Sequence, residues 1–334
     1  MKTTATDSSP ATPPDAGPAP IPQTTSDPAT VAGSALTTLA ALADLPFRAL
    51  PRRLLPGLPQ GGLSAVLLKA TALELAILAG HLVLYPSGLA PERRPAQGTG
   101  RVPGPGADQA AVPAATPERP PVLLLHGFID NRSVFVLLRR ALSEHGTRHL
   151  ESLNYSPLTS DVRAAAALLG RQVEELCERT GQERIDIVGH SLGGLIARYY
   201  VQRLGGDRRV RTVVTLGTPH SGTRVAPFAD AHPIVRQMRP GSSVVEELRE
   251  PAPGCRTRFV SFWSDLDQIM VPLETACVDH PDLIAENVRV TGIGHLALPV
   301  HPAVTAAVRE ALAADQAGGA ATGTADTRGG LTVA

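Results

Sequence analysis

A serine flanked by glycines lies near the middle of the chain, in Gly189-His-Ser-Leu-Gly193, which matches G-x-S-x-G. A serine hydroxyl attacks well when it stands exposed on a sharp strand-to-helix turn, where a base can reach it. Residues 185–188 are strand-like and residues 195–204 are helix-like, as such a turn requires. The alternative is a glycine-rich turn without chemistry, but G-x-G-x-x-G and a Lys-Ser/Thr ending are both absent. The pattern therefore predicts Ser191 as a nucleophile.

A nucleophilic serine needs a base, and the base needs a group that orients it. His295 follows a predicted strand near the end of the chain, and two aspartates, Asp265 and Asp267, follow the strand before it. We prefer Asp267 as the acid because it directly precedes an apolar run that should return to the core, and Asp265 is the alternative. His295 could instead be an ordinary loop histidine whose hydrogen bonds are satisfied. Either aspartate could instead be a loop cap or a turn former.

Acyl transfer also needs two donors for the oxyanion. The backbone N–H of Leu192 directly follows the nucleophile, and the N–H of Phe128 lies in the loop after the first predicted strand. His126 and Gly127 let that loop turn tightly, and we do not expect His126 to be catalytic. No calcium-type or cysteine-based zinc cluster is evident, so we expect neither a metal nor a cofactor.

The elements that position these residues alternate between strand and helix, which predicts a parallel sheet with right-handed crossovers. A continuous apolar strand such as 121–125 indicates burial on both faces of that sheet. The candidate residues all follow strands, at the edge where open parallel sheets build their sites. The predicted strands are 121–127, 147–155, 185–188, 211–217, 257–262 and 287–291, and the predicted helices are 133–145, 159–180, 195–204 and 302–313.

Composition divides the chain into five segments. Pro, Gly, Ser, Thr and Ala dominate its beginning, and such a segment buries too little apolar surface to offset its ordering entropy. The segments are a disordered, low-complexity N-terminal region (1–60), a hydrophobic helix (61–90), a Pro/Gly-rich linker (91–119), a catalytic domain (120–314) and a disordered tail (315–334).

The apolar run from Leu63 to Tyr85 is long enough to cross a bilayer, but it contains Lys69, Glu74 and His81. Each charge costs about 3 kcal/mol at a membrane centre. Three interpretations stay open: a signal-anchor helix, a helix lying on a membrane surface, and a helix packed on the catalytic domain. We favour membrane association through residues 63–85 or export, with a cytoplasmic protein as the alternative.

Charge and cysteine content exclude several classes of protein. The chain has 31 basic and 31 acidic residues, so nothing favours a nucleic-acid partner. Its three cysteines exclude a disulfide-dense scaffold. Cys177 lies in a helical pattern and is most simply a core residue. Cys255 and Cys277 flank one predicted strand and loop, and they could form a disulfide or remain two free thiols.

Five short pieces make a resemblance specific. The domain resembles bacterial triacylglycerol lipases and related esterases of the α/β-hydrolase superfamily, particularly actinobacterial members and small secreted bacillus-type lipases. The resemblance covers about residues 120–312 and none of residues 1–119. The pieces are Leu123-Leu-Leu-His-Gly-Phe128, Val188-Gly-His-Ser-Leu-Gly-Gly194, Thr215-Leu-Gly-Thr-Pro-His-Ser-Gly222, Arg239-Pro-Gly-Ser242 and Gly292-Ile-Gly-His295.

The resemblance implies an α/β-hydrolase fold, a mostly parallel sheet flanked by helices, with Ser, Asp and His in that chain order. It also implies hydrolysis of a lipid-like ester through an acyl-enzyme on Ser191. His220, in the Gly-Thr-Pro-His piece, would be structural rather than a second base. Segment 224–249 is the only candidate for a lid, and we expect residues 241–248 to form a capped helix at one wall of the acyl pocket.

Other functions remain open at this point. A thioesterase, phospholipase, polyester depolymerase or acyltransferase could use the same three residues. A membrane-tethered, non-catalytic module of the same fold is a further alternative, although an intact Ser, His and Asp set argues against it.

Overall fold

The computed structural model describes residues 65–89, 119–128, 130–155, 161–225, 232–317 and 330–332. The predicted N-terminal region 1–60 lies outside the described residues, as does the predicted linker 91–119 apart from residue 119.

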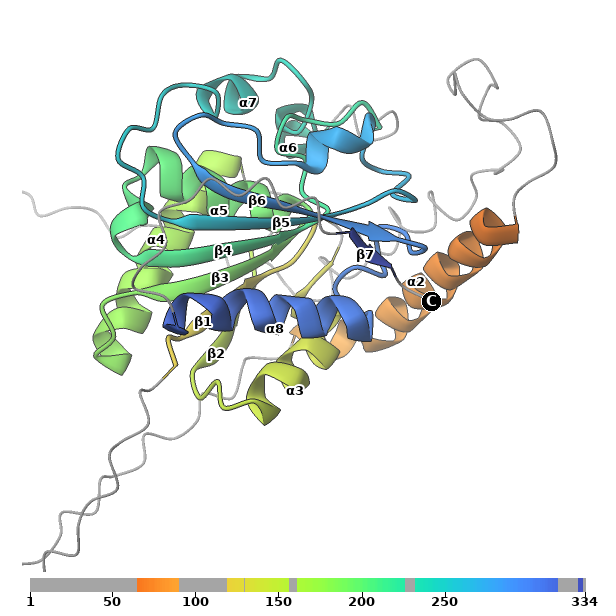
Figure 1. Cartoon of the computed structure of the whole chain (residues 1–334), viewed down its shortest axis with the longest axis horizontal. Helices are drawn as coiled ribbons and strands as arrows, with labels where there is room; N and C mark the ends of the chain where they lie inside the picture. Colours follow the sequence, from red (N-terminus) through yellow and green to blue (C-terminus); the bar gives the residue numbers. More distant parts are fainter. Residues whose placement is uncertain are drawn as a thin grey trace, which may run out of the picture. The chain divides into compact units, whose positions relative to one another are not determined.

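Seven parallel strands form one sheet in the described residues, in the order β2-β1-β3-β4-β5-β6-β7 (Figure 1). The first six are the six predicted strands, with ends that differ by a few residues. The parallel sheet is as expected. The strands are β1 (Val122–Leu125), β2 (Leu150–Leu153), β3 (Ile185–His190), β4 (Val210–Leu216), β5 (Arg258–Ser264), β6 (Ile284–Thr291) and β7 (Gly330–Thr332).

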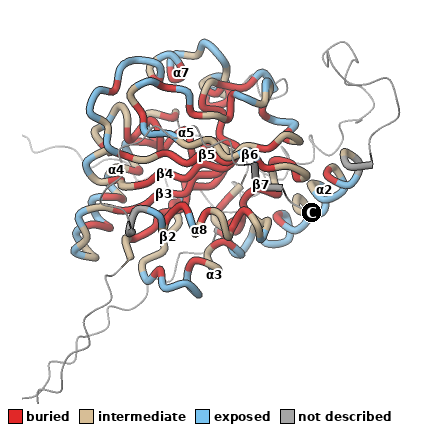
Figure 2. Tube along the Cα trace, viewed as in Figure 1, coloured by how far each residue is buried: buried red, intermediate tan, exposed pale blue. Residues whose placement is uncertain are grey.

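Helices cover both faces of the sheet, so its central strands are buried (Figure 2). Alternate residues of β1 belong to two hydrophobic clusters: Leu123 and Leu125 pack with α4 and α5, and Val122 and Leu124 pack with α3 and α8. The helices are α2 (Ala65–Leu89), α3 (Val136–Glu144), α4 (Val162–Thr180), α5 (Leu192–Arg203), α6 (Pro233–Gln237), α7 (Ser243–Glu247) and α8 (Pro302–Ala317), with short 3-10 turns at Arg132–Phe135, Gly206–Arg208 and Leu273–Ala276.

Side-chain caps explain where two of the predicted helices begin. The Asp161 carboxylate accepts hydrogen bonds from Arg163 N and Ala164 N at the start of α4. The Ser242 hydroxyl accepts one from Val245 N at the start of α7. Helices were expected at 159–180 and, with a cap, at 241–248, and the structure confirms both.

The C-terminal tail differs in part from the expectation of disorder from residue 315. Helix α8 continues to Ala317, and Gly330–Thr332 pairs with β6 as β7. Without β7, β6 would be an edge strand with unpaired backbone groups, which a short extended segment can satisfy. The rest of the tail lies outside the described residues.

The apolar run forms α2, which packs on the catalytic domain, one of the three interpretations. Its inward-facing residues recur every three or four positions, as one helix face requires. Its outward face is apolar, and Val83 is 79% exposed. By length and composition alone, the stretch Lys69–Gly88 could cross a membrane. The inward residues, buried or half-buried, are Ala70, Glu74, Ile77, His81, Tyr85 and Gly88, and the exposed large apolar ones are Leu73, Leu75, Leu82, Val83 and Leu84.

Candidate active site

Ser191 lies on a strained turn between β3 and α5. Its φ is 52° and its ψ is −119°, and it is the one non-glycine residue with a positive φ in the part of the chain that the structure describes. Its backbone N–H donates to Leu216 O at 2.9 Å, which ties the turn to β4. Such strain costs about 1–3 kcal/mol and persists where the surroundings impose it, as in a nucleophile turn.

Two glycines allow this turn because the helix approaches the strands closely. A Cβ on Gly189 would lie 2.5 Å from Gly194 N, and a Cβ on Gly193 would lie 2.3 Å from Leu125 O. Both contacts are with backbone, which has little freedom to move away. Close backbone contacts therefore explain why glycine is required on either side of Ser191.

His295 and Asp267 form a buried pair beyond the ends of β6 and β5. His295 Nδ1 lies 2.7 Å from Asp267 Oδ2. The other oxygen, Oδ1, accepts hydrogen bonds from Ile269 N at 2.8 Å and Met270 N at 3.0 Å. The carboxylate is thus held from both sides and turned toward the imidazole.

Asp265, the alternative acid, points elsewhere. Its Oδ2 lies 3.1 Å from Arg289 Nη2 at an exposed position, and its Oδ1 accepts a weak hydrogen bond from Gly292 N at 3.4 Å. The structure therefore brings Asp267, and not Asp265, against His295.

The charges in this pair support each other. Burial alone would lower the pKa of His295, but the charge of Asp267 and the hydrogen bond to it outweigh burial, so the pKa of His295 is raised above its usual 6.5. Burial would raise the pKa of Asp267, yet His295 and the two backbone donors hold it below its usual value. An imidazole in this setting can accept a proton and be stabilised in its charged form.

The His295 loop lies beside the serine turn. The carbonyl oxygen of His295 is 3.3 Å from Nε2 of His190, and the centroids of the two rings are 4.8 Å apart. A Cβ on Gly217 would lie 2.9 Å from His295 Nδ1, so glycine at this position leaves room for the imidazole. Thr218 Oγ1 donates to Ser191 O at 2.9 Å. Ser191, Asp267 and His295 therefore lie at the same carboxyl edge of the sheet.

The two candidate oxyanion donors lie at the same edge. Leu192 is the first residue of α5, where a backbone N–H has no partner within the helix. The loop after β1 runs alongside, because a Cβ on Gly127 would lie 3.4 Å from Ser191 Cβ. Phe128 follows, with its ring 5.1 Å from that of His232. His126 is buried, stacks on Tyr155 at 4.3 Å and donates no group toward Ser191 in the contacts described.

Sequence reasoning missed several polar residues around this edge. Asp130, in the loop after β1, lies 3.4 Å from His190 Nδ1 and 3.6 Å from His81 Nδ1 of α2. Burial opposes its charge, but both histidines hold the pKa of Asp130 well below its usual range. Glu74 of α2 contacts the backbone just after His295. A charge within an apolar run was the one signal that pointed to Glu74.

His220 has a structural setting, as the resemblance implied. It is buried, and its Nε2 lies 3.0 Å from Thr215 Oγ1. Burial and the nearby charge of Arg198 hold the pKa of His220 well below 6.5. Arg198 itself donates to His220 O and Leu248 O, each at 3.1 Å, and burial lowers its pKa to about 10.

The candidate lid segment is described from residue 232 onward, together with 224 and 225. Helix α7 packs against α4 and α5, where Glu247 bonds to Arg163 and Tyr199. Two residues of this segment contact the site loops: His232 begins α6 and its ring contacts that of Phe128, and Arg224 N donates to Val271 O at 3.1 Å, in the loop that carries Asp267. A role for residues 241–248 as an acyl-pocket wall stays a prediction.

Cys255 and Cys277 are free thiols in the structure, so the disulfide alternative is not realised. The two lie among different groups: charges of Asp207 and Arg184 act on Cys255, and those of Glu274 and Asp279 act on Cys277. Burial raises the pKa of both thiols, that of Cys277 to about 11.

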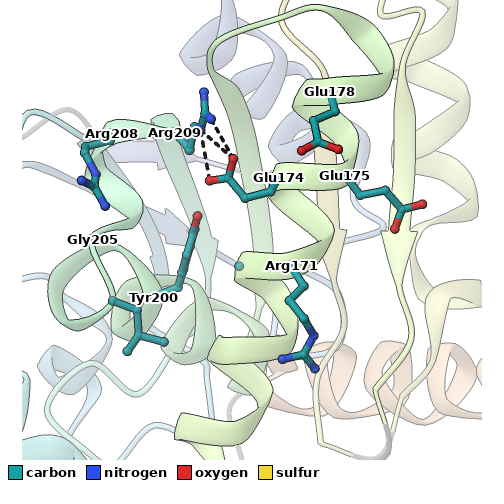
Figure 3. Close-up of a pocket in the computed structure, with 10 residues that line it drawn as sticks. Arg171, Glu174, Glu175, Glu178, Tyr200, Gly205, Arg208 and Arg209 are labelled. Carbon is teal, nitrogen blue, oxygen red and sulfur yellow. Dashed lines mark hydrogen bonds and ion pairs between the residues drawn. The ribbon is translucent and has the colours of Figure 1, made fainter.

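A separate hollow of about 780 Å³ lies between α4 and the C-terminal end of α5 (Figure 3). Its charged side chains include Glu174 and Arg209, which form an ion pair. None of the candidate catalytic residues lines it. Among the described residues, no group of three His, Cys, Asp or Glu side chains could hold a metal ion.

Residues 121–268 match the family model described as palmitoyl protein thioesterase. The chain is 31% identical over 137 residues to a triacylglycerol lipase of Burkholderia plantarii, covering 37% of each chain. It is 30% identical over 118 residues to one of Pseudarthrobacter phenanthrenivorans, covering 33% of this chain and 36% of that one. The match thus spans little more than a third of either relative.

The fold has a counterpart among solved structures. Aspergillus fumigatus lipase B superposes with a TM-score of 0.54 at 17% identity, over 72% of this chain and 68% of that chain. The resemblance to bacterial triacylglycerol lipases is confirmed, and the fold is that of an α/β hydrolase.

Proposed function

We propose that this chain, which has the α/β-hydrolase fold and resembles bacterial triacylglycerol lipases, is a serine carboxylic-ester hydrolase that works through an acyl-enzyme on Ser191. One observation carries the proposal: a serine at a positive φ shares the carboxyl edge of the sheet with a buried His295–Asp267 pair whose nitrogen and oxygen are 2.7 Å apart. This combination suits nucleophilic acyl transfer.

The proposed reaction has two halves. Ser191 Oγ attacks the acyl carbonyl while His295 Nε2 takes the hydroxyl proton, and Asp267 stabilises the imidazolium that forms. The backbone N–H groups of Leu192 and Phe128 hold the negative oxygen, worth about 3 kcal/mol each. His295 then gives the proton to the departing alcohol. Water then enters, and its oxygen attacks the acyl carbonyl while His295 takes one of its protons. As the acyl C–O bond to Ser191 breaks, His295 returns that proton to Ser191 Oγ and the acid leaves.

Replacement of the nucleophile is the direct test. Ser191→Ala should abolish hydrolysis of p-nitrophenyl acyl esters, and the circular dichroism spectrum should be unchanged. A fluorophosphonate probe should label the wild type and not the variant, which would exclude a non-catalytic module. Retained ester hydrolysis in Ser191→Ala would overturn the assignment.

A lipid-like acyl ester is the proposed substrate, because the relatives with matching pieces are named triacylglycerol lipases. A panel of acyl chains, soluble and emulsified, tests this and separates esterase from lipase. Preference for short soluble esters would overturn the lipid assignment. A phospholipase, polyester depolymerase or acyltransferase would appear in the same panel through its leaving group or acceptor.

A thioesterase is the second candidate, favoured by the family model that matches residues 121–268. The same serine, base and oxyanion donors serve a thioester, since only the leaving group changes. Rates on an oxyester and a thioester of the same acyl chain decide between them. A much higher kcat/KM for the thioester would replace the ester hydrolase assignment.

We also propose that the outward face of α2 rests on a lipid surface. The support is its row of exposed apolar side chains, with Leu75 at 51% and Val83 at 79% exposure. A double variant, Leu82→Ser with Val83→Ser, should float less with phospholipid vesicles than the wild type. Equal flotation of both proteins would remove this part of the proposal and favour a cytoplasmic protein.

A further inference from the structure

We propose that Glu74 of α2 is a positioning residue for the active site: its carboxylate holds the loop that carries His295. The helix that precedes the catalytic domain in sequence is then a working part of that domain. This inference rests on the proposed role of His295 as the base and extends it to a residue far away in the chain.

The contact is bidentate and involves the two residues directly after His295. Glu74 Oε2 accepts a hydrogen bond from Leu296 N at 2.8 Å, and Oε1 accepts one from Ala297 N at 3.0 Å. Residues 295–300 form turns rather than a helix or strand, so contacts from outside the loop contribute to its position. Two hydrogen bonds to one charged group fix both the position and the direction of these peptides.

The loop is shaped to receive this carboxylate. A Cβ on Gly294 would lie 2.6 Å from Glu74 Cδ, so only glycine leaves space for the glutamate to reach the backbone. Glu74 lies on the inward face of α2, where neighbouring Ile77 packs against the core. The Glu74 charge, which would be costly in a membrane, is thus matched by two backbone N–H donors in this loop.

Other contacts hold α2 in place independently of Glu74. Asn131 Nδ2 donates to Tyr85 O, and Asn154 Nδ2 donates to Gly88 O, each at 2.8 Å. Asn131 follows the loop that carries Phe128. Helix α2 therefore touches both loops beside the proposed site, and a change at Glu74 leaves its other attachments intact.

The charge of Glu74 affects the pKa of His295, and a role of Glu74 in packing alone would leave that pKa unchanged. Four titratable groups act on His295 from the elements around it: Asp267, Glu74 and Asp130 favour its protonated form, and His190 is the fourth group beside it. Burial raises the pKa of Glu74, while its backbone donors and His295 act in the opposite direction. Removing the Glu74 charge should lower the pKa of His295.

The experiment compares Glu74→Gln and Glu74→Ala with two controls in the full-length protein. Lys69→Gln removes an exposed charge from the same helix, α2, and Glu144→Gln removes an exposed glutamate of α3. We expect Glu74→Gln to lower kcat by about 10-fold on a soluble short-chain ester, because one charge-assisted contact is lost. KM should change by less than about twofold, since the loop binds no substrate.

The acidic limb of the pH profile of kcat/KM should move to lower pH in Glu74→Gln and stay in place in both controls. Glu74→Ala should lose more activity than Glu74→Gln, at an equal folded fraction by circular dichroism. The rate of fluorophosphonate labelling of Ser191 should fall in parallel with kcat.

Two outcomes would overturn the inference. One is a kcat for Glu74→Gln within about twofold of the wild type. The other is a loss of activity that follows the loss of folded protein with the pH limb unmoved, which would make Glu74 structural only. An inactive wild type, or one that the fluorophosphonate does not label, would instead overturn the proposed function and this inference with it.

Discussion

Replacing Asp267 by asparagine tests the proposed mechanism most sharply, because the backbone decides which way the new amide turns. Oδ1 accepts from Ile269 N and Met270 N, and Oδ2 faces His295 Nδ1. The asparagine oxygen should keep the two backbone donors, since the opposite orientation would leave both unsatisfied at about 1–3 kcal/mol each. The amide NH₂ must then donate to His295 Nδ1.

That orientation forces the wrong tautomer on the base. With Nδ1 acting as an acceptor, Nε2 of His295 carries the proton and cannot take one from Ser191. We expect kcat for Asp267→Asn to fall roughly 1,000- to 10,000-fold, which corresponds to about 4–5.5 kcal/mol in the barrier. The thermal unfolding curve should change little, because the amide fits the same space.

The assay is steady-state hydrolysis of a p-nitrophenyl ester by the wild type, Asp267→Asn and Asp265→Asn. Asp265 is paired with exposed Arg289, so Asp265→Asn should keep kcat within about threefold. A larger loss in Asp265→Asn than in Asp267→Asn would refute the assignment of the acid. A loss of less than about tenfold in Asp267→Asn would refute the tautomer argument.

Three further results should follow. The kcat/KM profile should fall as pH drops through the pKa of His295, with its midpoint above 6.5, because that pKa is raised and the neutral imidazole is the base; a midpoint below 6 would contradict this. Gly193→Ala should abolish soluble, active protein, because the new Cβ would lie 2.3 Å from Leu125 O. Its control, Gly80→Ala in helix α2, meets nothing within 4 Å and should raise the free energy of unfolding by about 1 kcal/mol in urea titrations. Arg198→Met should lower that free energy by about 3 kcal/mol, since it removes two hydrogen bonds from a charged group to buried carbonyls, and an unchanged urea midpoint would show that these contacts contribute nothing.

Local patterns were sufficient for much of the fold and the centre of the site. The continuous apolar run of β1 is visible in the sequence itself, and Gly189 is required by Gly194 N, five residues ahead. The capped starts of α4 and α7 are equally local, because Asp161 and Ser242 bond to amides two or three residues ahead. Local patterns of this kind can be recognised in a single sequence.

Long-range contacts could not be predicted in the same way. Asp265 and Asp267 are two residues apart on one loop, and only the path of the backbone selects the one that faces His295. The face of α2 that contacts the catalytic domain could not be predicted for a different reason. A polar stripe on a helix normally faces water, whereas Glu74 and His81 face the catalytic domain.

The span of the α2 contacts sets an order in which the protein can assemble during synthesis. Asn131 and Asn154 lie 46 and 66 residues after their partners in α2, so these attachments can form soon after α2 has been synthesised. Leu296 lies 222 residues after Glu74, so the partners of the Glu74 carboxylate are synthesised much later. His295 belongs to the same late stretch. A growing chain therefore contains Ser191 before it contains the proposed base and the loop that Glu74 holds.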